Sequence, residues 1–155
     1  MRFVIVVALA ACSLTVAAFA QAAIVPNVSI AGARIGMTEK QVRAALGAPR
    51  SISRDSTSAE LHYRTVTAVL VKGKVLGLST TAPSEKVAGT IGVGSTEAKL
   101  RQTVKGLKCV VNFGTRVCNL LRPGWKPGQG FTEFFIRAGR VRTISIRTSE
   151  PFTQS

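Results

Sequence analysis

The spacing of apolar residues predicts two short helices in this chain. Residues 35–46 and 93–104 each contain a pair of apolar residues four positions apart, the spacing of a helix that buries one face. Thr38 and Thr96 precede these pairs as N-cap residues, and the glutamate after each threonine suits the positive end of a helix dipole. Neither predicted helix is long enough to be stable alone, so each requires a surface on which to pack.

The two helical stretches also form an internal repeat. They align at an offset of 58 residues, with Gly, Thr, Glu and Arg recurring at matching positions. In the first stretch Gln41 can complete a capping box with Thr38, and Gly47 ends the helix. Gly106 has the same role after the second stretch. The repeat predicts that both parts of the chain begin with the same short element.

Strands are predicted after each helix. Residues typical of strands are concentrated in short segments on either side of two turns, which are centred on Gly73 and Gly139. The turn glycines are 66 residues apart, so the second copy is longer than the first. The predicted strands are residues 60–65, 67–71, 75–80, 132–137 and 141–148.

Together these elements predict an α+β fold of two tandem helix-plus-antiparallel-sheet repeats. The first repeat spans residues 33–81, the second spans residues 93–148, and residues 82–92 form a linker. In such a fold the helices cover one face of a sheet and leave the other face free. The free face is the expected place for contacts with other molecules.

The amino terminus predicts export. Arg2 precedes an uncharged apolar stretch at residues 3–18, and a small-x-small motif ends at Ala20, so residues 1–20 are predicted to be a signal peptide. Cleavage near Ala20 leaves a secreted or periplasmic, cell-envelope protein. Two alternatives stay open. The apolar stretch is retained as an anchor, although it is shorter than a spanning helix requires, or Cys12 ends a lipobox and carries lipid.

Cys109 and Cys118 are predicted to form a disulfide. They are the cysteines that remain after removal of residues 1–20, and an exported chain folds in an oxidising compartment. Apolar residues flank a turn-rich centre between them, which predicts a hairpin that brings the thiols together. A closed loop of about ten residues corresponds to roughly 2.7 kcal/mol in the chain-entropy model. A redox or metal pair is the alternative, but the spacing is not Cys-x-x-Cys and no histidine lies nearby.

One short motif connects the first helix with its hairpin. Its residues are Gly36, Met37, Thr38, Val42, Leu46, Gly47 and Pro49, followed by Val71-x-Gly73-x-Val75. This motif resembles that of the BamE/SmpA/OmlA family of small envelope proteins, and two tandem copies resemble the architecture of β-lactamase-inhibitor proteins (BLIP). The resemblance covers residues 33–148.

This resemblance implies non-catalytic protein binding at the cell envelope or outside the cell, through the open sheet face and its hairpins. It also implies a disulfide in the loop after the helix, a place that Cys109 and Cys118 match in the second copy alone. Inhibition of a secreted enzyme such as a β-lactamase is a further alternative. Inhibitors of that type carry an acidic residue on a first-domain hairpin, whereas the turn around Gly73 is basic here, which disfavours inhibition.

The residues of the chain do not predict an enzyme. His62 is the single histidine, and it lies in a predicted strand with Glu60 on the same face and no nucleophile assigned beside it. The sequence contains no HExxH, Gly-x-Ser-x-Gly or phosphate-loop motif. Because no set of residues has metal-ligand spacing, neither a metal nor a cofactor is expected.

Aromatic and cationic residues are the candidate contact residues. Trp125 lies in a Pro/Gly-rich connection, where it either anchors a partner or covers the core. Phe134 and Phe135 are strand neighbours and must point to opposite faces, as must His62 and Tyr63. We expect one residue of each pair to join arginines on the outer face of the sheet. The candidate contact residues are His62, Arg64, Trp125, Phe134, Arg137, Arg142 and Arg147.

Net charge supports a second hypothesis about the partner. The chain has 21 basic and 7 acidic residues and a net charge of +14, of which residues 1–20 contribute a single charge. Such a charge attracts polyanions such as cell-wall polymers, anionic lipid headgroups or extracellular DNA. The basic residues are scattered, so specific nucleic-acid recognition is not expected. The expected partner is therefore an unidentified envelope or extracellular protein, with an anionic polymer or membrane surface as the alternative.

Overall fold

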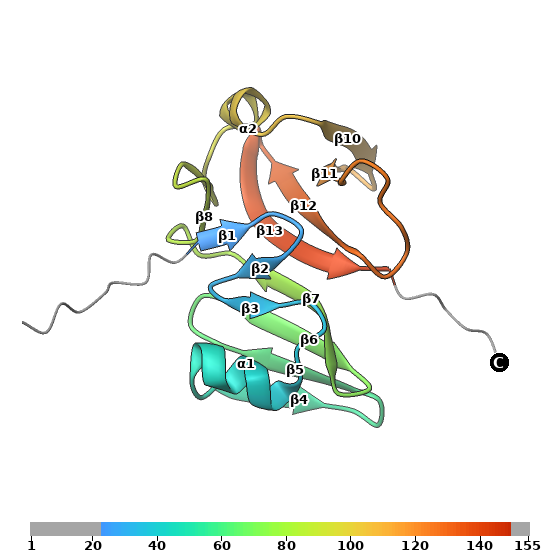
Figure 1. Cartoon of the computed structure of the whole chain (residues 1–155). Helices are drawn as coiled ribbons and strands as arrows, with labels where there is room; N and C mark the ends of the chain where they lie inside the picture. The colour runs from blue at the N-terminus through green and yellow to red at the C-terminus, as the bar shows by residue number, and fades with distance from the viewer. Residues whose placement is uncertain (1–22, 150–155) are drawn as a thin grey trace, which may run out of the picture.

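Residues 23–149 are described in a computed structural model of the chain, and strands make up most of their regular structure (Figure 1). The predicted signal peptide, its cleavage site and Cys12 lie outside these residues. Within residues 23–149, no helix is both long and apolar enough to cross a membrane. Two sheets and two short helices build this part of the chain.

The larger sheet has eight strands in the order β10-β11-β12-β13-β7-β6-β5-β4. Every neighbouring pair in it is antiparallel. The helix α1 (Glu39–Leu46) precedes four of these strands along the chain, and α2 (Glu97–Thr103) precedes the other four. The strands are β4 (Ser51–Arg54), β5 (Ser58–His62), β6 (Thr67–Val71), β7 (Lys74–Thr80), β10 (Leu107–Asn112), β11 (Thr115–Leu120), β12 (Gly130–Arg137) and β13 (Arg140–Thr148).

The smaller sheet has five short strands in the order β3-β2-β1-β8-β9. Asn27, in the turn after β1, ties this sheet to β12. Its backbone N–H donates to the Thr132 hydroxyl at 2.7 Å, and its side-chain oxygen accepts from the same hydroxyl at 2.8 Å. The strands are β1 (Ala23–Val25), β2 (Ser29–Ile30), β3 (Ala33–Arg34), β8 (Lys86–Val87) and β9 (Ile91–Gly92).

Both predicted helices are present, and local capping explains where they begin. Thr38 accepts a hydrogen bond from the backbone of Gln41, and the Gln41 side chain accepts one from the backbone of Thr38, so the predicted capping box is confirmed. Thr96 caps the second helix by accepting from a backbone N–H three residues later. Val42 and Leu100 are fully buried, so each helix packs one face against the rest of the molecule.

The larger sheet has a covered face and an open face. Along β13, Ile144 and Ile146 point to the covered face and are fully buried, whereas Ser145 and Arg147 point to the open face. The helices and the smaller sheet contribute their apolar residues to one core on the covered face. The large, fully buried apolar side chains of this core are Ile30, Val42, Leu61, Leu70, Val75, Leu78, Ile91, Leu100, Phe134, Ile144 and Ile146.

A central ladder between β7 and β13 joins the two halves of the larger sheet. Its register pairs Ser79 with Ser145 and Gly77 with Arg147. The ladder gives both strands a hydrogen-bonded neighbour on each side, so neither is an edge of the sheet. The edges are instead β10 and β4.

The predicted α+β fold of two tandem helix-plus-antiparallel-sheet repeats is wrong. The structure is predominantly β, with helices of only 8 and 7 residues, and its strands form one eight-stranded and one five-stranded sheet. The prediction missed the smaller sheet because its strands have only two or three residues, too few to show a period. It missed the continuity of the larger sheet because strand pairing between distant segments leaves no local pattern.

Candidate functional site

The open face of the eight-stranded sheet is the candidate contact surface. Cross-strand pairing fixes its composition, because directly opposed residues share a face. The helices and the smaller sheet pack on the covered face, so within residues 23–149 no second layer covers the open face. Its side chains, from β11 across to β5, include Val117, Asn119, Phe135, Glu133, Phe131, Thr143, Ser145, Arg147, Ser79, Thr67, Val69, His62 and Glu60.

Small hydroxyl side chains form the centre of the open face. Ser145, Ser79 and Thr67 are directly opposed on β13, β7 and β6. Gly77 lies two residues before Ser79 on the same face of β7. Such short side chains leave the backbone of the sheet close to the surface. The centre therefore offers hydrogen-bonding groups on a shallow surface.

An aromatic and cationic cluster borders this centre, and we call it the Trp125 cluster. It consists of Trp125, Phe131, Glu133 and Arg147. The Trp125 and Phe131 rings meet edge to face, with centroids 5.7 Å apart and an interplanar angle of 86°. The Arg147 guanidinium lies 5.4 Å from the centroid of the Phe131 ring. A cation at that distance over an aromatic ring is attracted by the ring quadrupole.

The sequence explains why these groups meet. Phe131 and Arg147 are directly opposed on β12 and β13. Trp125 reaches them from the Pro/Gly-rich connection before β12, where its indole N–H donates to the Gln129 carbonyl at 2.9 Å. The Lys126 N–H donates to the Gln129 side chain in the same loop, which holds the connection in one shape.

Glu133 anchors the cationic member of the cluster. Its side chain is only 5% exposed, and it accepts a charged hydrogen bond from Arg147 at 2.6 Å, whereas Arg147 is 57% exposed. Ser145 donates a second hydrogen bond to the same carboxylate. A buried carboxylate needs such partners. The ion pair with Glu133 holds the Arg147 side chain in place, while more than half of that side chain stays exposed.

Six of the predicted contact residues are distributed over three regions. His62 and Arg147 lie on the open face, and Trp125 lies beside it, half-buried and outside the main core. Arg137 and Arg142 are exposed near the turn between β12 and β13, where the Arg142 Nε donates to the Arg137 carbonyl. Arg64 is exposed in the loop between β5 and β6.

Phe134 is wrongly placed among the predicted contact residues. Its side chain is 0% exposed and lies in the core, opposite Cys118 and Ile144. Its neighbour Phe135 is on the open face, as are Phe131 and Glu133, none of which the sequence analysis selected as contact residues. Side chains alternate between the two faces along β12, so one residue known to be buried on this strand would assign each of these side chains to its face.

His62 has polar neighbours on the open face. Its Nδ1 lies 3.4 Å from the Thr67 hydroxyl, and its Nε2 lies 4.0 Å from the Glu60 carboxylate. Both distances exceed the 2.6–3.2 Å, approximately, at which a general base takes a proton. The three side chains therefore form a loose polar group on an exposed sheet surface.

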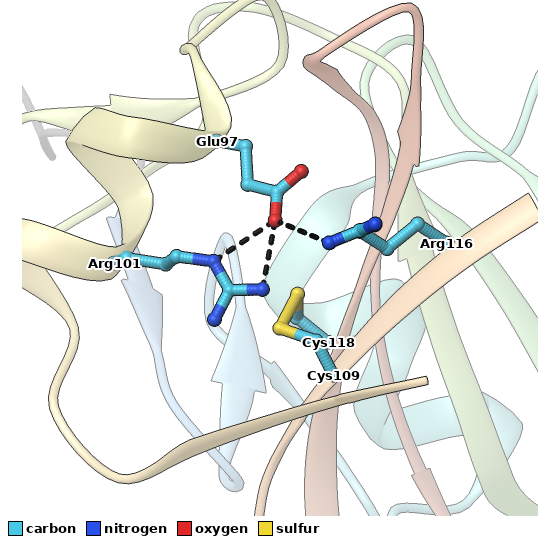
Figure 2. The surroundings of a disulfide bond; sticks show 5 residues. All are labelled: Glu97, Arg101, Cys109, Arg116 and Cys118. Atoms are coloured by element: carbon cyan, nitrogen blue, oxygen red, sulfur yellow. Dashed lines mark hydrogen bonds and ion pairs between the residues drawn. A yellow bond between two sulfur atoms is a disulfide. The ribbon is translucent and has the colours of Figure 1, made fainter. Parts of the chain in front are cut away.

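The predicted disulfide between Cys109 and Cys118 is confirmed. The Glu97 carboxylate, bound by two arginines, lies beside it (Figure 2). The cysteines are directly opposed on β10 and β11. Glu97, on the first turn of α2, accepts hydrogen bonds from Arg101 at 2.9 Å and from Arg116 at 3.2 Å. The Glu97 oxygen and the two sulfurs lie within 4.8 Å of one another, but sulfurs joined in a disulfide are not thiolate ligands.

The first half of the chain contains the same arrangement without a disulfide. Glu39, on the first turn of α1, accepts from Arg43 at 2.7 Å and from Arg54 at 2.8 Å. In each half the glutamate thus links its own helix, through one arginine, and a strand of the larger sheet, through another. Hydrogen bonds from Arg54 and then Arg43 lower the pKa of Glu39.

We expect replacement of Glu97 by glutamine to destabilise the protein in a pH-dependent way. The hydrogen bond from Arg101, with the charge of Arg116, lowers the pKa of Glu97 below its usual 4.5. The carboxylate therefore adds stability above pH 4.5, and this contribution is lost as the pH falls through the lowered pKa. At neutral pH we expect a cost of about 1 kcal/mol in urea unfolding, because the ion pairs are near the surface.

The control for this experiment is Glu60→Gln, which removes an exposed carboxylate whose partner is the His62 ring nitrogen at 4.0 Å. This variant should stay within about 0.5 kcal/mol of the wild type. A Glu97→Gln deficit that persists unchanged in acid would show that the loss comes from packing and not from the charge.

The geometry defines a mostly β protein in which one face of a large sheet is left open. A similar fold occurs in the crystal structure of an extracellular protein containing an SCP domain from Bacillus anthracis strain Ames, with a TM-score of 0.50 and 11% sequence identity. The similarity covers 74% of this chain and 44% of that chain, so this chain matches less than half of that protein's length. At this identity the likeness concerns the fold alone. No model of a known protein family and no curated protein matches the sequence.

The resemblance to the BamE/SmpA/OmlA family and to tandem BLIP repeats is wrong. The structure has two sheets with little helix, and its similarity is to part of an SCP-domain extracellular protein. The motif that carried the resemblance has a local explanation. Gly36 and Gly47 have φ values of 83° and 82°, a region that favours glycine, and Thr38 between them caps α1. A capped helix between two turns therefore accounts for the motif. The hypothesis of enzyme inhibition depended on the resemblance and has no other support.

Proposed function

We propose that this protein is an exported, non-catalytic binding protein that contacts a partner protein of the envelope or extracellular space through its open sheet face. Three observations support this proposal. Residues 1–20 have the pattern of a signal peptide, the chain contains a disulfide, and the open face is not covered within residues 23–149. The extracellular location stated for the structurally similar protein is compatible with export.

The Trp125 cluster is the observation that carries the proposal. Tryptophan and arginine are enriched among the residues that dominate binding energy at protein interfaces, and they act best when the surrounding side chains exclude water. Here Trp125 packs against Phe131, and Arg147 is held by Phe131 and Glu133, so little side-chain freedom is lost on binding. The shallow hydroxyl centre beside them supplies hydrogen-bonding groups for the rest of an interface.

Capture from envelope extracts tests this function. Immobilised protein should retain a defined partner at ~0.5 M salt, because screening at that concentration leaves short-range contacts in place. Trp125→Ala should weaken this capture about tenfold or more, since an interface tryptophan contributes at least ~1.4 kcal/mol. The matched control is Leu121→Ala, which removes an apolar side chain, 38% exposed, from the same connection outside the cluster. Equal loss in both variants, at unchanged melting temperature, would contradict the proposed site.

A second candidate function is binding to anionic polymers. Residues 93–148 contain eleven basic and two acidic residues, and both acidic residues, Glu97 and Glu133, already form ion pairs with arginines. This half of the molecule is therefore strongly positive. Release of all captured material at ~0.5 M salt, together with equal binding to any polyanion, would favour this function over a protein partner.

A further inference from the structure

The tip of the β10–β11 hairpin exposes an unusual amount of apolar surface. Phe113 is 101% exposed, Val111 is 64% exposed and Val110 is 55% exposed. These are the three highest values among the exposed large hydrophobic residues of the described chain. Val110 and Val111 are neighbours on β10 and point to opposite faces, so apolar side chains lie on both sides of the hairpin behind Phe113.

The backbone of this tip does not require an aromatic residue. The last pair of the hairpin leaves Phe113 and Gly114 as a two-residue turn, with φ values of 46° and 74°. Positive φ at both positions favours Asn-Gly, and a bulky residue at the first position is strained. The same X-Gly turn, with positive φ at both residues, occurs elsewhere in the fold with small or charged residues at X: Ala31-Gly32, Lys72-Gly73, Ala88-Gly89 and Ala138-Gly139. Phe113 therefore adds strain without adding to the core.

Cations surround this apolar tip. Arg116 is directly opposite Ile136, which places the β10–β11 turn at the same end of the sheet as the β12–β13 turn. A shallow depression there is lined by Val111 and Arg116 from one hairpin and by Arg137 from the other. Arg142 donates to the Arg137 carbonyl and so lies at the same end. Within residues 23–149 neither Arg137 nor Arg142 pairs with a carboxylate, and the nearest acidic residue to Arg116 is Glu97, which is shared by two arginines.

An anionic lipid surface is the partner that fits this combination. A protruding aromatic side chain with two valines behind it can enter the boundary between headgroups and acyl chains, and arginines at the same level can bind lipid phosphates. We propose that the β10–β11 tip, with Arg137 and Arg142, attaches the protein to anionic membranes. The tip lies at the end of the larger sheet, where Val110, opposite Val117, continues the open face. The membrane proposal does not depend on the function proposed above.

Vesicle sedimentation tests this site. The protein used is the chain from Gln21 to Ser155, which contains every described residue and lacks the apolar stretch at residues 3–18. It should bind vesicles of equimolar phosphatidylglycerol and phosphatidylcholine and leave pure phosphatidylcholine vesicles unbound. Phe113→Asn should weaken binding about tenfold, because the inserted ring is lost. Asparagine is also the residue that this turn prefers, so the variant should keep or raise the melting temperature.

Charge variants separate a local site from the effect of net charge. Arg137→Gln with Arg142→Gln should weaken binding about tenfold, because each cation near an anionic membrane surface adds to the binding free energy. The matched control is Lys72→Gln with Lys74→Gln, which removes two cations from the hairpin turn at the opposite end of the sheet and should change little. Equal losses from the two double variants would overturn the local site.

Fluorescence gives a direct readout of insertion. Trp125 is the single tryptophan, so Phe113→Trp in a Trp125→Phe background reports on the tip alone. Its emission should shift to shorter wavelength with the anionic vesicles. An unshifted emission, or binding that Phe113→Asn leaves intact, would overturn the proposal. Loss of a captured protein in Phe113→Asn without any vesicle binding would also overturn it and assign the tip to a protein partner.

Discussion

Replacement of Phe134 by alanine is expected to lower the free energy of unfolding by about 3–5 kcal/mol. The ring is 0% exposed and is paired with Cys118 on one side and Ile144 on the other, both also fully buried. Removal of the ring leaves a cavity in the middle of the covered face, and two neighbouring strands cannot move inwards without breaking their ladders. Urea unfolding monitored by circular dichroism measures this loss.

The adjacent residue supplies the matched control. Phe135→Ala removes the same ring from the open face, where it is half-buried, and should cost much less than Phe134→Ala. A larger cost for Phe135→Ala than for Phe134→Ala would reverse the assignment of the two faces. The same pair of variants tests binding, because the Phe135 variant alone removes a side chain that a partner on the open face can reach.

Removal of the disulfide is the second large effect. The double variant Cys109→Ala with Cys118→Ala should lose about 2.7 kcal/mol, the chain-entropy value for a closed loop of about ten residues. Alanine is used in place of serine because Cys118 is fully buried, and a hydroxyl there would need a new partner. The measurement is urea unfolding of the wild type and the variant under oxidising conditions.

A reductant distinguishes the stability contributed by the disulfide cross-link from that contributed by packing of the cysteine side chains. Dithiothreitol should lower the stability of the wild type towards that of the double variant and leave the double variant itself unchanged. If the reductant does not alter the wild type while the variant is much less stable, the loss comes from packing of the two sulfur atoms and not from the cross-link.

Local signals in the sequence predicted several elements well. The N-cap residues Thr38 and Thr96 marked the start of both helices, and the turn glycines Gly73 and Gly139 marked two hairpins. The disulfide was predicted because its two cysteines remain after the predicted cleavage of an exported chain and flank a turn. Each of these features depends on residues close together in sequence, where propensity and hydrogen bonding act directly.

Features that depend on distant pairing were not predictable in this way. Nothing in residues 74–80 or 140–148 specifies that β7 and β13 lie side by side, because each is an ordinary alternating strand. The parallel pairing of β1 with β8 rests on two residue pairs, Ala23 with Lys86 and Ile24 with Val87. These contacts are selected by burial of the whole core, so the fold class was wrong although its pieces were right.

In the candidate site, too, residue types were predictable from the sequence, whereas features that depend on strand register were not. Trp125, Arg147 and His62 were selected by residue type, but the choice between Phe134 and Phe135 required the register of β12. Glu133 was not selected, since a single acidic residue in a strand carries no signal of its own. Its role depends on Arg147, which is two positions diagonal to it on the neighbouring strand. Phe113 was placed in a turn by the sequence, but its full exposure became visible only with the hairpin in place.

The position of β13 has a consequence for how the chain matures. This strand is the last one in the described sequence, yet it lies in the middle of the larger sheet, between β12 and β7. Until residues 140–148 are available, β12 and β7 each lack one of their two neighbours and the larger sheet is incomplete. The two halves of the larger sheet can therefore join only after residues 140–148 have been synthesised.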